Sequence, residues 1–197
     1  MMLKERYQKE IAVALQHDLQ EENVLAVPRV RKVVLNVGTG KQQREPKFQE
    51  GVMDSLTRIT GQRPVATLSR TSIAAFKLRE GAPVGVMVTL RGQRMWDFLE
   101  KLVRVSLPRV RDFRGLSPRT VDEFGNLSIG FREHVVFPEI RSDEVELVHG
   151  MQVTVVSSAG SHARGMALFR ALGLPFRQMD PPAKRVRRTR ERKAATA

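Results

Sequence analysis

The amino-acid sequence predicts an α+β fold, with a mainly antiparallel or mixed sheet and helices packed on one of its faces. The first observation is that segments with strand periodicity and segments with helical periodicity follow one another along the 197 residues. The second is a change of period within residues 84–117. Its first apolar residues alternate, as in a strand with one buried face: Val84, Val86, Val88 and Leu90. After Gly92 the apolar residues form a helical stripe: Met95, Trp96, Leu99, Leu102 and Val103.

Four more elements are predicted before this run. Residues 2–20 carry apolar side chains four positions apart, which predicts an amphipathic helix. Residues 30–37 alternate as a strand does. A helix is expected from near Pro46 to Gly61, and a short strand over residues 63–68. One face of the first strand then carries Lys32, Val34 and Asn36.

The remaining segments complete the prediction. Residues 69–83 are expected to form a long loop, and loops of this length inside compact domains usually have a function. Pro108 is expected to end the helix, on which Asp97 with Lys101 and Glu100 with Arg104 are spaced for ion pairs. Further on we expect strands over residues 127–131 and 151–157 and a helix over residues 160–172. The domain is thus expected to span residues 1–178, followed by a basic, disordered extension over residues 179–197.

The composition indicates a polyanionic partner. The formal net charge is +13 and the isoelectric point is about 11.1, which points to nucleic acid or an anionic membrane surface. The chain has no cysteine, so thiol catalysis and cysteine-based zinc sites are excluded. No apolar run approaches the ~20 residues of a membrane span, and the charged N-terminus does not resemble a signal peptide. We therefore expect a cytoplasmic protein without a membrane partner.

The charge is unevenly distributed along the chain. Residues 91–119 and residues 180–197 each have a net charge of +5, whereas residues 120–150 have seven acidic and only two basic side chains. This segregation predicts a basic face for RNA and a separate acidic patch that faces away from phosphates.

Several motifs resemble segments of the L-five family of bacterial ribosomal proteins, and they occur in the family's order over roughly residues 1–178. The first is Val27-Pro28-Arg29-Val30 with Leu35-Asn36-Val37-Gly38. The second is the run from Leu56 to Ser72, followed by Phe76-Lys77-Leu78-Arg79-Glu80-Gly81. The third comprises Val84–Ser117, Phe137-Pro138-Glu139-Ile140 and Leu174-Pro175-Phe176-Arg177. The resemblance implies a non-enzymatic constituent of the large ribosomal subunit that binds 5S rRNA and adjacent 23S rRNA in the central protuberance.

The resemblance also implies binding residues. Asn36, Gln62, Thr89 and Arg91 are expected to contact a looped part of 5S rRNA, since such side chains bond to phosphates, base edges and 2′-hydroxyls. The loop 69–83 is expected to reach the peptidyl-site tRNA through Arg70, Thr71, Lys77 and Arg79, although Thr71 and Glu80 stand where the family commonly has more basic or neutral residues. Arginines spaced along a loop can follow a phosphate backbone, so Arg109, Arg111 and Arg114 are further candidate rRNA contacts.

Other partners follow from the same resemblance. Neighbouring large-subunit proteins are expected, and a region near the acidic patch meets a small-subunit protein at an intersubunit bridge in this family. A solvated acidic face explains that patch equally well, and the target of the basic extension stays open. No cofactor and no protein-bound metal are expected.

Other function classes fit less well. Gly38-Thr39-Gly40-Lys41 lacks the spacing of a phosphate-binding loop, and the four histidines have no ligand spacing. A nuclease or RNA-modifying enzyme would therefore lack a recognisable site. The alternative is a nonspecific basic nucleic-acid-binding protein or RNA chaperone outside the ribosome, and selectivity for 5S rRNA at raised salt discriminates between the two.

Overall fold

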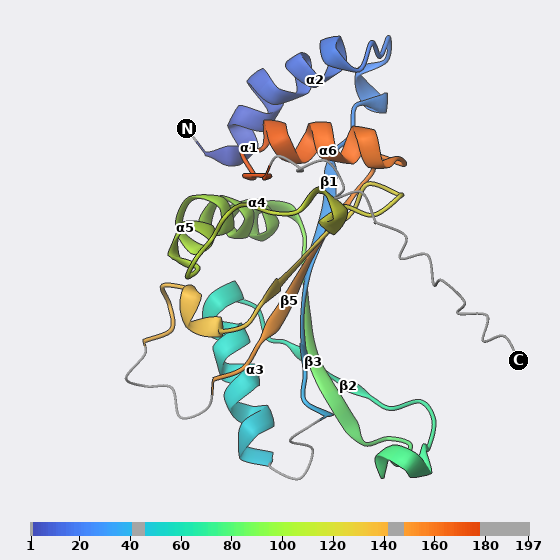
Figure 1. Ribbon diagram of the computed structural model, residues 1–197, viewed down its shortest axis with the longest axis vertical. Coiled ribbons are helices and arrows are strands. Elements are labelled where there is room, and N and C mark those ends of the chain that lie inside the picture. The colour runs from blue at the N-terminus through green and yellow to red at the C-terminus, as the bar shows by residue number, and fades with distance from the viewer. Residues whose placement is uncertain (1, 41–45, 142–147, 178–197) are drawn as a thin grey trace, which may run out of the picture.

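A five-stranded antiparallel sheet organises the protein (Figure 1). The structure is a computed structural model that describes residues 2–40, 46–141 and 148–177. The strand order is β2-β3-β1-β5-β4, so the first strand lies at the centre between two strands that come later in the chain. The strands are β1 (Val30–Gly38), β2 (Val65–Leu68), β3 (Pro83–Leu90), β4 (Leu127–Phe131) and β5 (Met151–Ser157).

The helices gather on one face of the sheet and at one of its ends (Figure 1). The N-terminal helix consists of α1 (Leu3–Arg6), a π-helical turn (Tyr7–Ile11) and α2 (Ala12–Asp18), and it packs beside α6 (His162–Ala171) at the end of the sheet. Helices α3 (Pro46–Thr60) and α4 (Gly92–Lys101) cover one face. A second π-helical turn (Leu102–Ser106) continues α4 into α5 (Leu107–Arg109). Short 3-10 turns occupy Val24–Ala26, Ala74–Phe76, Pro118–Thr120 and His134–Val136.

The hydrophobic core lies between the sheet and α3 and α4. Val33, Leu35 and Val37 of β1 are fully buried, and so are their neighbours on β3, Val86 and Leu90. These are the alternating positions that the sequence predicts to face inward, and the helical stripe with Met95 and Leu99 covers them. The residues between them therefore point to the other face, which no described helix covers, and we call this the open face. The α+β prediction, with helices on one face, is confirmed.

Two local predictions were wrong. The helix does not stop at Pro108, because Ser106 and Leu107 before it keep a right-handed helical backbone and the π-helical turn runs on into α5. The chain leaves the helix only after Arg109. Lys101 does not pair with Asp97, because Glu139 from another segment lies 2.5 Å from its Nζ, whereas the pair of Arg104 with Glu100 is present at 2.7 Å.

Candidate RNA-binding surface

The open face presents two rows of mostly polar side chains that run across the strands. In one row Asn36 of β1 lies between Met87 of β3 and Gln152 of β5. In the next row Val34 lies between Thr89 and Thr154. Both Asn36 and Gln152 are exposed. Side-chain amides and hydroxyls aligned in this way can donate to and accept from the riboses and base edges of an RNA.

The structure brings Gln62, Thr89 and Arg91 together at one end of the open face. Gln62 follows the C-terminal end of α3, and its Nε2 donates to the backbone carbonyl of Thr89 at 3.1 Å. This bond fixes the amide next to the end of β3. Arg91 follows Thr89 by two residues. It is exposed, and its backbone is extended just before α4. Three of the four residues predicted to bind 5S rRNA therefore lie close together, and Asn36 lies further along the same face.

Two basic residues beside a β-bulge in β1 were not predicted as RNA contacts from the sequence. The register between β1 and β5 shifts between Val30 and Lys32, so Arg31 and Lys32 both lie between the buried Val30 and Val33. Arg31 is exposed and Lys32 is partly exposed. Lys32 directly precedes Val33, which pairs with Leu90, the residue before Arg91. The basic residues thus continue the group formed by Gln62, Thr89 and Arg91.

The open face is free of strand carboxylates, which suits an anionic partner. None of the five strands contains an aspartate or glutamate. Lys32 and Arg91 lie at one end of the face, and Arg132 is exposed just after β4. A phosphate backbone would therefore meet positive or neutral groups along these strands.

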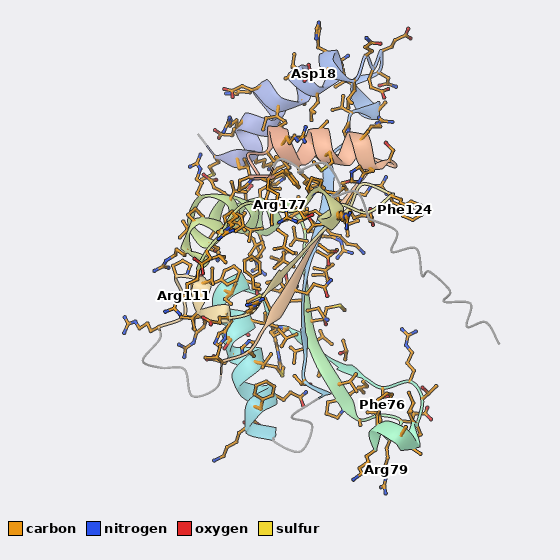
Figure 2. All side chains as sticks on the ribbon, in the orientation of Figure 1. Asp18, Phe76, Arg79, Arg111, Phe124 and Arg177 are labelled. Atoms are coloured by element: carbon orange, nitrogen blue, oxygen red, sulfur yellow. The ribbon has the colours of Figure 1, made fainter. Side chains whose placement is uncertain are left out.

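The segment between β2 and β3 is an ordered hairpin extension and not an irregular loop. Backbone amides of Ser69 and Ile73 donate to the carbonyls of Ala82 and Leu78 at 2.8 and 2.9 Å. A 3-10 turn at Ala74–Phe76 forms the tip, where Phe76 is 77% exposed. Figure 2 shows Phe76 and Arg79 at the end of this projection, away from the body of the protein. The four predicted tRNA-binding residues are all exposed on this hairpin tip: Arg70, Thr71, Lys77 and Arg79.

The arginines at and after the end of α5 form a separate basic region. Arg109, Arg111 and Arg114 are exposed, and none of them has an ion pair in the part of the chain that the structure describes. The positive φ of Asp112, 51°, shows a tight turn between Arg111 and Arg114, and the Asp112 carboxylate pairs with none of the three arginines. In Figure 2 Arg111 projects on the side of α5, opposite to Phe76. The structure does not bring these arginines together with the open-face residues.

The acidic patch is in part a rigid turn. The Asp122 carboxylate accepts from the backbone amide and the side-chain amide of Asn126, at 2.6 and 2.8 Å. Burial acts to raise the pKa of Asp122, but these bonds, with further backbone bonds from Phe124 and Gly125, outweigh it and lower the pKa. Asp122 is therefore ionised at neutral pH, and it repels phosphate beside the exposed Glu123 and Phe124. Asp143, Glu144 and Glu146 lie outside the described residues, as does the basic extension.

The described residues contain no site with enzyme-like or metal-binding chemistry. A shallow pocket of about 240 Å³ lies between α3 and α4, and its Lys101 is engaged by Glu139 and by the carbonyl of Ile59 at 2.6 Å. No group of three histidine, aspartate or glutamate side chains in these residues could hold a metal ion. Nor is any described helix long and apolar enough to pass through a bilayer.

Comparison with known proteins decides the family. Residues 23–79 match the family model of ribosomal protein L5, and residues 83–176 match the model of the C-terminus of the same family. The large ribosomal subunit protein uL5 of Halothermothrix orenii is 49% identical over 177 residues, which is 90% of this chain and 99% of that protein. The chain belongs to the ribosomal protein L5 family. The uL5 proteins of a Roseiflexus species and of Streptomyces avermitilis are 50% and 49% identical over 89% of this chain and 97% and 95% of their own lengths.

Membership in the ribosomal protein L5 family settles the class of function. The protein is a non-enzymatic constituent of the large ribosomal subunit, and it is therefore bound to ribosomes in the cytoplasm. Its partners are rRNA and other ribosomal components. The resemblance inferred from the sequence motifs is confirmed.

Proposed function

We propose that the protein anchors 5S rRNA, together with adjacent 23S rRNA, in the central protuberance, through the open face of its sheet. The observation that carries this proposal is the group of Gln62, Thr89 and Arg91 beside Lys32, on strands without carboxylates. Because Gln62 is held by the Thr89 carbonyl, its amide is preorganised for a base edge or a 2′-hydroxyl. Arg91 supplies a bidentate donor for phosphate or guanine. Asn36 extends the contact along the face.

Three other surfaces have separate roles in this proposal. The hairpin tip contacts the peptidyl-site tRNA through Arg70, Thr71, Lys77 and Arg79, since it projects far from the sheet and carries three positive charges. Arg109, Arg111 and Arg114 contact a different stretch of rRNA, on the side of the protein where Arg111 projects. The acidic segment around Asp122 meets a basic protein of the small subunit at an intersubunit bridge.

The test is the affinity for 5S rRNA across a salt series, with tRNA as the competitor. We expect selective binding that persists at salt concentrations that dissociate nonspecific complexes. Arg91→Ala should weaken it by about 10- to 100-fold, which corresponds to ~1–3 kcal/mol. The matched control is Arg104→Ala, which removes the same charge from the helical side and should change the affinity little.

Two results would contradict the proposal. Equal, salt-sensitive binding to both RNAs would favour the alternative, a nonspecific basic nucleic-acid-binding protein or RNA chaperone. An unchanged affinity of Arg91→Ala would mean that 5S rRNA does not lie on the open face.

A further inference from the structure

Gly130 is an unusual residue for its place in the sheet. It lies within β4, between the buried Ile129 and Phe131, so its own side-chain position points to the open face, where it is exposed. It pairs with Gln152 of β5, which in turn pairs with Asn36 of β1. Gly130 therefore ends the same row that contains one of the proposed 5S rRNA contacts.

The fold does not require a glycine there. A Cβ atom at Gly130 would have no atom within 4 Å, and its φ is not positive. The β4–β5 register runs without a shift from Leu127 to Phe131, so there is no bulge. By contrast, a Cβ at Gly85, on β3, would lie 2.9 Å from the Thr67 hydroxyl and the Val37 carbonyl. Glycine inside a strand weakens it, and apart from bulges and bends it often marks a place where a ligand or another backbone approaches closely.

The neighbours of Gly130 show what kind of molecule fits. Gln152 and Asn36 are exposed amides, and neither side chain has a hydrogen-bond partner within the described segments. The next row holds the hydroxyls of Ser128 and Thr154, 3.3 Å apart. Arg132 follows two positions after Gly130, and it is exposed. Free amides, hydroxyls and one cation around a flat, side-chain-free spot suit a ribose–phosphate strand.

We propose that the RNA bound on the open face extends to β4, where its ribose–phosphate strand packs against the backbone of Gly130. Gln152 and Asn36 donate to phosphate or 2′-hydroxyl oxygens beside this contact. The inference rests on the proposed function, because it assumes that 5S rRNA lies on the open face. It extends the proposed binding surface to β4, the strand of the sheet that lies furthest from Gln62.

The experiment compares Gly130→Val with wild-type protein, by thermal unfolding of the free protein and by affinity for 5S rRNA at one salt concentration. We expect an equal or higher Tm, because valine suits a strand and meets no atom, together with at least a 10-fold loss of affinity. The salt dependence should stay the same, since no charge is removed. Gln152→Ala should weaken binding several-fold.

The matched control is Gly51→Ala in α3. Gly51 is also exposed, and a Cβ there would also meet nothing, but it lies on the helical side. Gly51→Ala should raise the Tm and leave the affinity for 5S rRNA unchanged.

The outcomes separate this inference from the proposed function. If Arg91→Ala weakens binding and Gly130→Val stays within twofold of wild type, RNA does not reach β4 and the inference fails alone. If Gly130→Val lowers the Tm, the glycine serves the fold and the inference is also overturned. If neither variant weakens binding, the placement of RNA on the open face is itself wrong.

Discussion

At the scale of single residues, the bulge in β1 shows how a backbone irregularity changes a binding surface. In a regular strand, adjacent residues point to opposite faces, so only one of Arg31 and Lys32 would avoid the core. The register shift places both between the buried Val30 and Val33, and neither has to enter the core. The bulge is what keeps Arg31 out of the core, whereas Lys32 lies on the open face by its alternation with the buried Val33. Since Val33 pairs with Leu90, Lys32 comes next to Arg91. A charge at that position is available for a phosphate.

Lys32→Gln should therefore remove one phosphate contact. We expect the slope of the logarithm of the 5S rRNA affinity against the logarithm of salt concentration to become smaller by about 0.7–0.9. The control is Lys9→Gln, which removes an exposed charge from the N-terminal helix. Equal slopes for Lys32→Gln and wild type would show that no phosphate lies at this end of β1.

A second prediction concerns His134, which is buried and stacked on His149. The two ring centroids are 3.8 Å apart, and the planes differ by 13°. Burial lowers the pKa of His134, while its hydrogen bond with the His149 backbone acts in the opposite direction. In the unfolded chain the imidazole binds a proton near pH 6.5, so below this pH the unfolded state holds more protons than the folded state. The free energy of unfolding should therefore decrease as the pH falls below about 6.5.

Urea unfolding between pH 7.5 and 5 measures this decrease. His134→Gln should make the pH dependence flatter, because the variant has no imidazole at this position. His17→Gln serves as the control, since His17 is on the surface helix α2 and shows no comparable burial. If His134→Gln keeps the full pH dependence of the wild type, another group causes it.

At the scale of elements, the hairpin tip differs most from its sequence prediction. The sequence predicts a long loop over residues 69–83. The order comes instead from backbone hydrogen bonds, such as that between Ser69 and Ala82, and from Lys77 in the left-handed conformation, with a φ of 52°. Neither the backbone hydrogen bonds nor the left-handed conformation produces a recognisable pattern of apolar and polar residues in the sequence. An ordered tip holds Phe76 out into solvent beside Lys77, which a flexible loop would not do.

Phe76→Ala should weaken binding of peptidyl-site tRNA to large subunits that contain the variant protein. An exposed aromatic ring next to positive charges can stack on a nucleobase, and loss of such a stack typically costs ~1–3 kcal/mol. Phe124→Ala is the matched control, because Phe124 is 70% exposed on an equally rigid turn but follows two acidic residues, Asp122 and Glu123. Equal tRNA affinities for both variants would exclude a role of the aromatic ring, and the salt series would then test the charges of the hairpin tip alone.

At the scale of the whole molecule, the sequence predicts the strands and their faces but not their neighbours. The alternation in β1 and β3 correctly places Asn36 and Thr89 away from the core. Periodicity carries no information on pairing, however, so the position of β1 between β3 and β5 had to come from the structure. For this reason Gln152, opposite Asn36, could not be identified as part of the surface. The sequence already places Lys32 on the same face as Asn36, but it does not show that Lys32 lies next to the end of β3.

The end of the described chain closes the fold. The Arg177 amide donates to the Leu116 carbonyl at 3.0 Å, and the Leu116 amide donates to the Pro175 carbonyl at 2.8 Å. Gly115 permits this approach, since a Cβ there would lie 2.9 Å from the Arg177 nitrogen. The family match also ends at residue 176. Folding should therefore not depend on residues 178–197, which contain seven basic and two acidic side chains.

A protein truncated after Arg177 should keep its Tm and its preference for 5S rRNA over tRNA. It should lose affinity mainly at low salt, and the salt dependence of binding should become weaker, because a basic segment contributes phosphate contacts without reading sequence. Replacing the seven basic residues of this segment by glutamine in the full-length chain should have the same effect, which separates charge from length. If truncation alone abolishes 5S rRNA binding while the Tm stays constant, the basic extension is the primary site. The open face would then only orient an RNA that the extension holds.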